Sequence, residues 1–391
     1  MTKNKKPHLN ILTIGRAEDF SINLKEVFSK VLVSTGGENI DPTASSYDEY
    51  YADIVPNGIQ KIDYETDNRS YTNIFYANHS DYLKTMFEGA MQFDGFVLAL
   101  KAGVDFRDET LKQISLAKKI CDKKMVVFLD TSNSIMEEDE SLLEMLEMEI
   151  RELISSIGLS GYDTPIINGS IEAVMQNRDP EIGKNRILKL TNALDSYIDA
   201  PIPDNEKDFF MPIQDVFYNG IRGTIATGLI ETGSVKLGDE LEVLGFGSTK
   251  KITCAGIDNL GQPVSSSEAG NDVGLILGDV RRGTIKRGQV ICKPNTVSLS
   301  DNFEAEIYVM SKDESGVDAK IVSNLCPNIS LNAYINTASL TLLGDVNAIS
   351  QCQSGAVNVR LLDSIAIKQF QRFEIFENNR RIGVGIITKM L

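Results

Sequence analysis

The sequence predicts an α/β domain with a mostly parallel sheet, followed by two antiparallel β-barrel domains. Up to residue 200, short apolar runs alternate with segments of helical period, as in a parallel sheet covered by helices. After residue 206 the helical period disappears, and short strands follow one another across glycine turns, as in antiparallel barrels. A Pro- and Asp-rich segment at 199–205 and a second break near 293–296 separate these regions. We therefore expect domains at 1–200, 206–296 and 298–391.

In the first domain, strands and helices alternate. Strands are expected at 9–15, 71–76, 95–100, 125–129 and 164–168, and those at 95–100 and 125–129 are continuous apolar runs. The helices place apolar residues three or four positions apart and are expected at 23–32, 80–93, 108–121, 139–158 and 184–197. Strands without polar alternation are buried on both faces, so helices must cover both sides of the sheet.

The second and third domains contain short strands and turn residues only. In the second domain we expect a strand, turn and strand within 224–238, then strands at 240–245 and 251–257. In the third domain we expect strands at 303–310, 356–362 and 372–376. Their close spacing favours an antiparallel arrangement in each domain.

Composition excludes several classes of protein. The 391 residues carry a net charge of −16, and the first 205 contain 21 basic and 34 acidic residues, which makes this part a poor general phosphate binder. The five cysteines are far apart, without a Cys-x-x-Cys pair, and there are only two histidines, so we expect no metal site and no disulfide framework. The sequence shows neither a secretory signal nor an apolar run of about 20 residues. We expect a cytoplasmic protein that does not bind membranes.

Short segments in all three predicted domains resemble the elongation factor Tu family. Pro212–Phe217 and Gly223–Gly233 are similar to the family's PIEDVF and GTVVTGRVERG strands, and Arg287–Pro294 is similar to its RGQVLAKPG segment. Similar segments in the first and third domains are Lys6–Gly15, Glu144–Leu153, Phe303–Glu314 and Gly383–Lys389. The resemblance extends through nearly the whole chain. It implies a P-loop-type GTPase domain with magnesium and GTP, and two barrels that help to bind aminoacyl-tRNA.

The phosphate-binding segment departs from the family. A P-loop needs glycines around the phosphates, a lysine for the β- and γ-phosphates and a hydroxyl for Mg²⁺. The family's G-H-V-D-H-G-K-T-T corresponds to a segment that starts at Gly15. In it, Phe20 stands at the second glycine, Ser21 at the lysine and Ile22 at the threonine. The resemblance therefore identifies the place of the site but not its chemistry.

The other nucleotide-binding segments also depart. The family's D-C-P-G-H becomes a segment in which Phe75 replaces the magnesium-facing aspartate and Asn78 replaces the γ-phosphate-sensing glycine. The guanine-reading N-K-x-D begins with Asp130 and ends with Asn133. The remaining two positions are Gln60, at the magnesium-binding threonine, and Ser170, which is kept in the last guanine loop. Because catalysis in this class is positioning and charge stabilisation, we expect neither GTP nor Mg²⁺ as a cofactor.

His79 corresponds to the family's catalytic histidine, which orients the attacking water. One interpretation is a retained catalytic group. The favoured interpretation is a scaffold histidine, because a positioned base does nothing without its electrophile. We therefore expect no catalytic residue.

The resemblance also implies an aminoacyl-tRNA pocket in the second domain. Gln214, Asp215 and Phe217 lie on its strand, Asp258 stands at a glutamate that meets the terminal ribose, and Asp272 replaces an asparagine. Two arginines of the family's tRNA surface are missing, so we expect tRNA binding to be weak. The alternative interpretation is that both aspartates are solvated loop residues.

The acidic helix 139–157 implies a protein partner, because the family's helix there meets the exchange factor and the ribosomal stalk. Its alternative is an ordinary amphipathic helix with solvated glutamates. We expect an exchange-factor-like, ribosomal, or toxin or inhibitor protein as partner, bound through this helix or the barrel surfaces.

Three hypotheses for function follow. The first is a pseudo-GTPase that acts in translation as a binding protein, decoy or regulator of the true factor's partners. The second is a divergent, active GTP-dependent factor that delivers aminoacyl-tRNA. The third is a nucleotide-independent tRNA-binding module.

Overall fold

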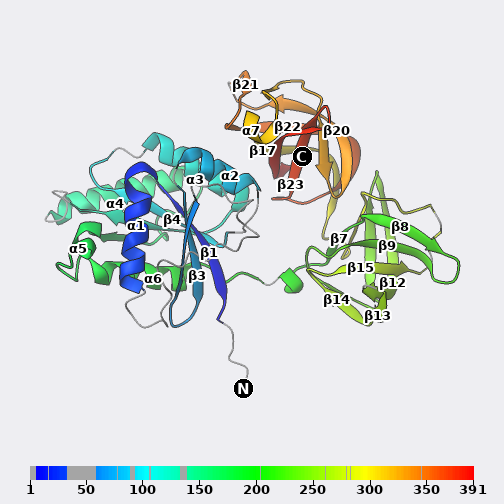
Figure 1. Cartoon of the computed structure of the whole chain (residues 1–391), viewed down its shortest axis with the longest axis horizontal. Helices are drawn as coiled ribbons and strands as arrows, with labels where there is room; N and C mark the ends of the chain where they lie inside the picture. The colour runs from blue at the N-terminus through cyan, green and yellow to red at the C-terminus, as the bar shows by residue number, and fades with distance from the viewer. Residues whose placement is uncertain are drawn as a thin grey trace. The chain divides into compact units, whose positions relative to one another are not determined.

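The chain divides into two compact units, Met1–Pro201 and Ile202–Leu391, which are described one at a time (Figure 1). The computed structural model describes residues 6–15, 17–32, 59–76, 78–88, 93–104, 107–132, 139–202, 204–259, 261–278, 280–281, 283–344 and 346–391, without the side chains of 17–23, 59 and 107–109. No helix within these ranges is long and apolar enough to cross a membrane.

The first unit contains a six-stranded sheet in the order β2-β3-β1-β4-β5-β6. Only β2 is antiparallel to its neighbour, and the other strands are parallel. In chain order, the strands are β1 (His8–Ile14), β2 (Ile59–Glu65), β3 (Ser70–Tyr76), β4 (Gly95–Lys101), β5 (Met125–Asp130) and β6 (Ile166–Gly169). The predicted α/β class is confirmed.

Helices pack on this sheet through apolar stripes. They are α1 (Ala17–Leu32), α2 (His79–Glu88), α3 (Arg107–Cys121), α4 (Glu140–Ser156), α5 (Ile171–Met175) and α6 (Lys184–Tyr197). One core cluster joins α1, α5 and α6 to β1, β3, β4 and β5, and its largest side chains include Phe28, Tyr71 and Phe128. Asp139 begins α4 as its N-cap, because its side chain accepts hydrogen bonds from the amides of Ser141 and Leu142.

In the first unit, the sequence analysis did not predict the five-residue helix α5 or strand β2. Ile62 and Tyr64 are buried while Lys61, Asp63 and Glu65 are exposed, which is the alternation of a half-buried strand. The run is short and strongly charged, so its two buried side chains give a weak signal. Helix α1 also begins six residues before the expected start at residue 23.

The second unit begins with a curled antiparallel half-barrel in the order β7-β16-β11-β12-β15-β9-β8, with β13 paired to β12 and a separate β10–β14 pair. The strands are β7 (Phe210–Pro212), β8 (Asp215–Asn219), β9 (Gly223–Leu229), β10 (Ser234–Lys236), β11 (Glu240–Gly245), β12 (Ser248–Asn259), β13 (Gln262–Val264), β14 (Ser266–Glu268), β15 (Asp272–Leu277) and β16 (Val290–Cys292). A short 3₁₀ helix, Asp204–Glu206, precedes it.

The rest of this unit is a closed six-stranded barrel in the order β17-β22-β20-β19-β23-β24. Its strands are β17 (Ser298–Val309), β19 (Asn328–Leu331), β20 (Tyr334–Leu342), β22 (Ser354–Ile367), β23 (Arg372–Glu377) and β24 (Arg380–Met390), with α7 (Lys312–Ser315), β18 (Ile321–Val322) and β21 (Ala348–Ile349) beside them. The predicted pair of antiparallel β-domains is confirmed, the first as a half-barrel and the second as a closed barrel.

Candidate functional site at the carboxyl edge of the parallel sheet

The parallel strands of the first unit all end at one edge of the sheet, where ligands of α/β folds bind. Gly15 follows β1, Asp130 ends β5 and Ser170 follows β6. Asn78 follows β3 at the same edge. The fold therefore brings four of the predicted positions to one edge. Gln60 comes from β2 and lies directly opposite Phe75 of β3.

The hydroxyl of Tyr76 is hydrogen-bonded to the backbone of Gly15. The Gly15 amide donates a hydrogen bond to Oη of Tyr76 at 3.1 Å. The same hydroxyl lies 3.4 Å from the Gly15 carbonyl and 3.4 Å from Oε1 of Gln113, either of which can accept its hydrogen. Tyr76 is buried, and its ring packs against Tyr82 at 5.0 Å. A group from the end of β3 thus takes the amide that begins the predicted phosphate-binding segment.

The turn between β1 and the first helix is very short. Helix α1 begins at Ala17, two residues after Gly15. Phe20, Ser21 and Ile22 therefore belong to the first turns of a helix, although their side chains lie outside the described residues. Gly15 packs closely on β4, where an added Cβ would lie 2.5 Å from the Ala99 carbonyl oxygen. A phosphate-binding loop needs several successive backbone amides outside the helix. The connection between β1 and α1 is too short to supply them.

Phe75 belongs to the hydrophobic core. It is 1% exposed, and its ring meets that of Phe28 in an edge-to-face arrangement at 6.4 Å. Phe28 lies on α1, so Phe75 helps to hold that helix on the sheet. A carboxylate at this position would be surrounded by apolar side chains.

Asn78 and His79 form the start of helix α2. Oδ1 of Asn78 accepts a hydrogen bond from the Asp81 amide at 2.9 Å, and its Nδ2 donates to the Asp81 carboxylate at 2.8 Å. Asn78 is therefore a helix cap. Burial raises the pKa of Asp81, and the Asn78 hydrogen bond partly opposes this shift. The exposed His79 ring stacks on Tyr82 at 5.9 Å.

Asp130 and two serines join the ends of β5 and β6. The buried Asp130 carboxylate accepts hydrogen bonds from the Ser132 amide and the Ile171 amide, each at 3.1 Å, and from the Ser132 hydroxyl. Ser132 lies 3.1 Å from the Ser170 hydroxyl and accepts from the Glu172 amide at 3.0 Å. Asn133 lies outside the described residues.

Sequence reasoning missed Tyr76 and Ser132. Tyr76 follows Phe75 directly, and an aromatic residue at a strand end gave no sign of a hydrogen bond to Gly15, which lies 61 residues away. Ser132 lies in the segment that corresponds to the family's N-K-x-D. Its hydroxyl was the one feature of the sequence that could have suggested a hydrogen bond there. Tyr76 and Ser132 both make hydrogen bonds to other residues at the carboxyl edge of the sheet.

The predicted aminoacyl-tRNA residues lie on the half-barrel. Asp215 of β8 pairs with Thr227, Thr227 with Gly274, and Gly274 with Asp258, so the two aspartates belong to one cross-strand row. Asp258 forms an ion pair of 3.2 Å with Arg222. Phe217 is 54% exposed on β8, Asp272 begins β15 opposite Leu229, and Gln214 precedes β8. Three of the five predicted residues are thus aspartates, and one of them, Asp258, is paired with an arginine.

The predicted partner helix is α4. Leu146, Ile150 and Ile154 form its buried stripe. Its outer side exposes Met145 and Met148, which are 63% and 62% exposed. The two methionines are three positions apart and therefore neighbours on the helix surface, and methionine side chains adapt to different contacts.

Comparison with known families supports the whole architecture. Residues 54–200 match the elongation factor Tu GTP binding domain, residues 223–292 match elongation factor Tu domain 2, and residues 296–391 match the elongation factor Tu C-terminal domain. The first match begins after β1 and the altered phosphate-binding segment. The order of the three matches is that of the observed α/β domain, half-barrel and barrel. The chain therefore belongs to the elongation factor Tu family and has the domain architecture of its translational GTPases.

Proposed function

We propose that this chain is a pseudo-GTPase, a translation-associated binding protein that neither binds nor hydrolyses GTP as its family does. The observation that carries the proposal is the hydrogen bond between the Gly15 amide and Tyr76. It is supported by the start of α1 at Ala17, which leaves few free loop amides for phosphates. The match to the GTP binding domain beginning only at residue 54 agrees with this divergence.

The residues at the family's magnesium- and guanine-binding positions are not suited to bind these ligands in this chain. Phe75 is buried in the core, and the Asp130 carboxylate is engaged by three donors of its own chain. In the sequence, Ser21 and Ile22 supply neither the lysine nor the hydroxyl of a P-loop. His79 is consequently assigned no catalytic step, and neither GTP nor Mg²⁺ is proposed as a cofactor.

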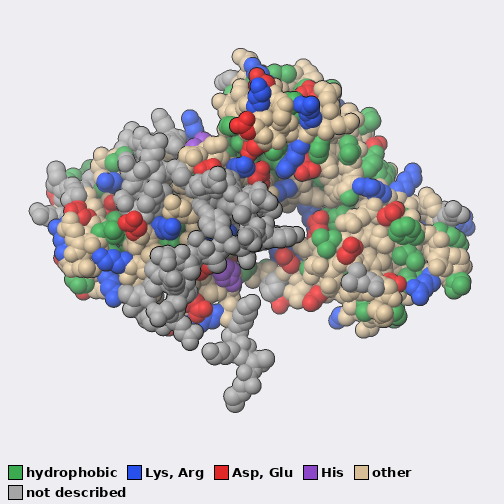
Figure 2. Space-filling model, in the orientation of Figure 1, with side chains coloured by type: hydrophobic (Ala, Val, Ile, Leu, Met, Phe, Trp, Pro, Cys, Tyr) green, Lys and Arg blue, Asp and Glu red, His purple; other side chains and the backbone are tan. Residues whose placement is uncertain are grey.

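The proposed role is that of a decoy or regulator that meets partners of the true factor. The exposed methionines of α4 support a protein contact there, with an exchange-factor-like, ribosomal, toxin or inhibitor protein as candidate. Transfer RNA is a weaker candidate, because Asp215 and Asp258 share one row of the half-barrel. On the face in Figure 2, acidic and basic side chains are interspersed over both units instead of forming one broad basic surface.

Calorimetric titration of the nucleotide-free chain with GDP and GTP tests the proposal. With and without Mg²⁺, we expect no binding heat and no change in Tm at millimolar nucleotide. Magnesium-dependent binding would instead favour the divergent, active GTP-dependent factor. Binding of tRNA with a steep salt dependence, and without nucleotide, would favour the tRNA-binding module.

The partner is tested separately. Proteins that bind the true factor should bind this chain in a purified pull-down, and a Met145→Ser, Met148→Ser double variant should bind less. Met175→Ser is a matched control, because Met175 is 39% exposed on another helix. If none of the true factor's partners binds, the decoy role is wrong.

A further inference from the structure

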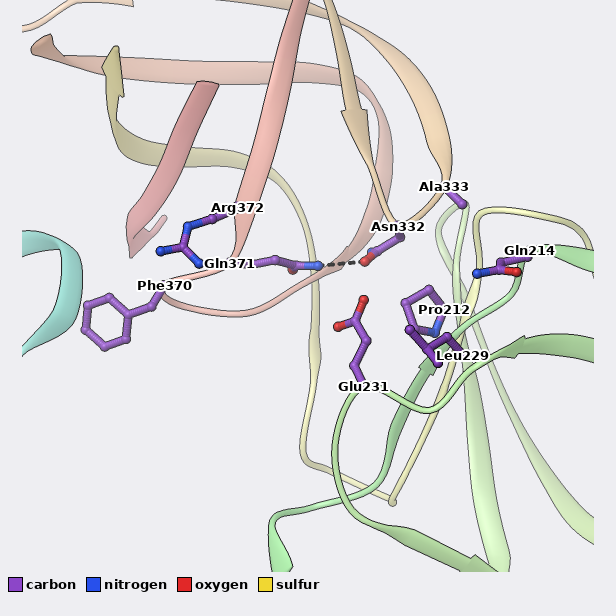
Figure 3. A pocket seen from close by; sticks show the side chains of 9 residues that line it. All are labelled: Pro212, Gln214, Leu229, Glu231, Asn332, Ala333, Phe370, Gln371 and Arg372. Carbon is purple, nitrogen blue, oxygen red and sulfur yellow. Dashed lines mark hydrogen bonds between the residues drawn. The ribbon is translucent and has the colours of Figure 1, made fainter. Parts of the chain in front are cut away.

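A pocket of about 410 Å³ lies in the second unit between the half-barrel and the closed barrel (Figure 3). Residues of the half-barrel line one side of it: Pro212, Gln214, Leu229 and Glu231. Residues of the closed barrel line the other: Asn332, Ala333, Phe370, Gln371 and Arg372. Its volume falls within the range of small-ligand sites, roughly 300–1,000 Å³.

Glu231 is the acidic group of this pocket. In Figure 3 its carboxylate points into the space below the Asn332–Gln371 pair. Its backbone is fixed, because the Glu231 amide donates to the Phe210 carbonyl at 3.0 Å. Its carboxylate makes no hydrogen bond or ion pair within the part of the chain that the structure describes. Glu231 is an exposed residue, yet partial desolvation raises its pKa, and the charge of Lys368 opposes this shift.

Lys368 is the cation whose charge acts on Glu231, and it is also engaged by an aromatic ring. Its Nζ lies over the Phe210 ring, 3.1 Å from the centroid, which is a cation–π contact. Lys368 opposes the pKa shift of Glu231 only in part, and burial lowers its own pKa to about 8. Among the described residues Glu231 therefore forms no ion pair, and Lys368 offsets its negative charge only in part.

The walls of the pocket are fixed in advance. Asn332 accepts from Nε2 of Gln371 and donates to the Ala366 carbonyl, both at 2.6 Å. Asn332, Ala333 and Phe370 all have positive φ, from 53° to 64°, a strained conformation for Ala and Phe that collects at functional sites. Arg287 of the half-barrel donates to the Ala333 carbonyl at 3.0 Å and braces this turn across the junction.

We propose that this pocket binds a monovalent organic cation, a guanidinium or ammonium head on a short aliphatic stem. Glu231 takes the head, while Pro212 and Leu229 offer apolar surface to the stem. Arg372 also lines the pocket and disfavours a second positive charge. The cation belongs either to a free small molecule or to a basic side chain of a bound peptide.

The test uses the full chain and two monovalent probes, n-propylguanidine and acetyl-Gly-Arg-Gly-amide, titrated by calorimetry at low ionic strength. The matched neutral control ligand is n-propylurea. Glu231-dependent binding of propylguanidine assigns a free small molecule. Binding of the peptide in addition assigns a pocket open to a partner's side chain.

Two pocket variants and one control variant make the test decisive. Glu231→Gln should weaken binding at least about tenfold, since hydrogen bonds to charged groups are the strong ones. Leu229→Arg should abolish it by placing a cation at the pocket, and Glu240→Gln, an exposed acid of β11, should change nothing. Affinity should also fall as pH falls and Glu231 is protonated. Equal binding of propylurea, an unaffected Glu231→Gln variant, or no binding of either probe overturns the proposal.

Discussion

Replacing Tyr76 by phenylalanine tests the hydrogen bond between its hydroxyl and the Gly15 amide, which we propose closes the phosphate-binding edge. The substitution keeps the ring, which packs against Tyr82 at 5.0 Å, and removes only the hydroxyl. The Gly15 amide then loses its 3.1 Å acceptor, and Gln113 loses a neighbour at 3.4 Å. Since Tyr76 is 2% exposed, water does not simply replace the hydroxyl.

The expected cost follows from that burial. A buried donor without a partner costs about 1–3 kcal/mol. Because 1.4 kcal/mol corresponds to a factor of ten, the Gly15 amide should exchange hydrogen roughly 5- to 150-fold faster if it opens locally. The first unit has about 200 residues, for which roughly 2–4 °C corresponds to 1 kcal/mol, so its Tm should fall by roughly 2–12 °C.

The assay is hydrogen exchange of the peptide that contains Gly15, together with calorimetry of the full chain. Tyr162→Phe is the matched control, because Tyr162 is 86% exposed and should lose its hydroxyl without cost. If Tyr76→Phe behaves like Tyr162→Phe in both measurements, the hydroxyl does not hold Gly15. If Tyr76→Phe gains GTP binding, the hydroxyl alone blocks the site, and the start of helix α1 at Ala17 does not prevent nucleotide binding.

Two further predictions concern buried charges. Asp130→Ala removes the acceptor of three hydrogen bonds and should destabilise the first unit by about 3 kcal/mol or more. Asp130→Asn keeps an acceptor and should destabilise it less. Equal Tm values for the two variants would contradict this prediction. Burial lowers the pKa of Lys368 from 10.5 to about 8, so between these pH values the unfolded chain binds more protons and the Lys368 contribution to stability rises with pH. Urea titrations from pH 7.5 to 10 should show a smaller rise for Lys368→Met than for the wild type, and parallel curves would refute the assignment.

The elements of the first unit could be predicted from the sequence wherever one physical signal dominated. Helix α6 lies at the expected 184–197, because its apolar stripe is clear. The buried strands β4 and β5 end within one residue of their expected positions. Strand β2 was missed because only Ile62 and Tyr64 are buried in a charged segment, and the sheet edge rather than the local sequence makes it a strand.

The sequence indicated where the candidate site lies, but not which contacts its residues make. Sequence comparison identified Phe75 and Asn78 at positions that usually face magnesium and phosphate. It did not reveal that Phe75 packs on Phe28 or that Asn78 caps α2. These roles depend on which distant side chains the sheet brings together, and the bond from Gly15 to Tyr76 spans 61 residues. The pocket at Glu231 was missed for the same reason, because its walls come from two β-domains.

The proposed loss of the nucleotide would leave a physical problem that substitution of its binding residues alone does not solve. Backbone amides and carboxylates that once met phosphate, metal or base would stay unpaired in a buried edge, each at a cost of about 1–3 kcal/mol. Here the Tyr76 hydroxyl accepts a hydrogen bond from the Gly15 amide. Ser132 and Ile171 donate hydrogen bonds to the Asp130 carboxylate. Restoring a lysine at position 21 alone would therefore place a cation beside an edge whose partners are already taken. A protein that had only recently lost its nucleotide would lack the lysine but would not yet have these replacement hydrogen bonds. Its sheet edge would be unstable without a ligand, whereas an edge with the replacement bonds would be stable.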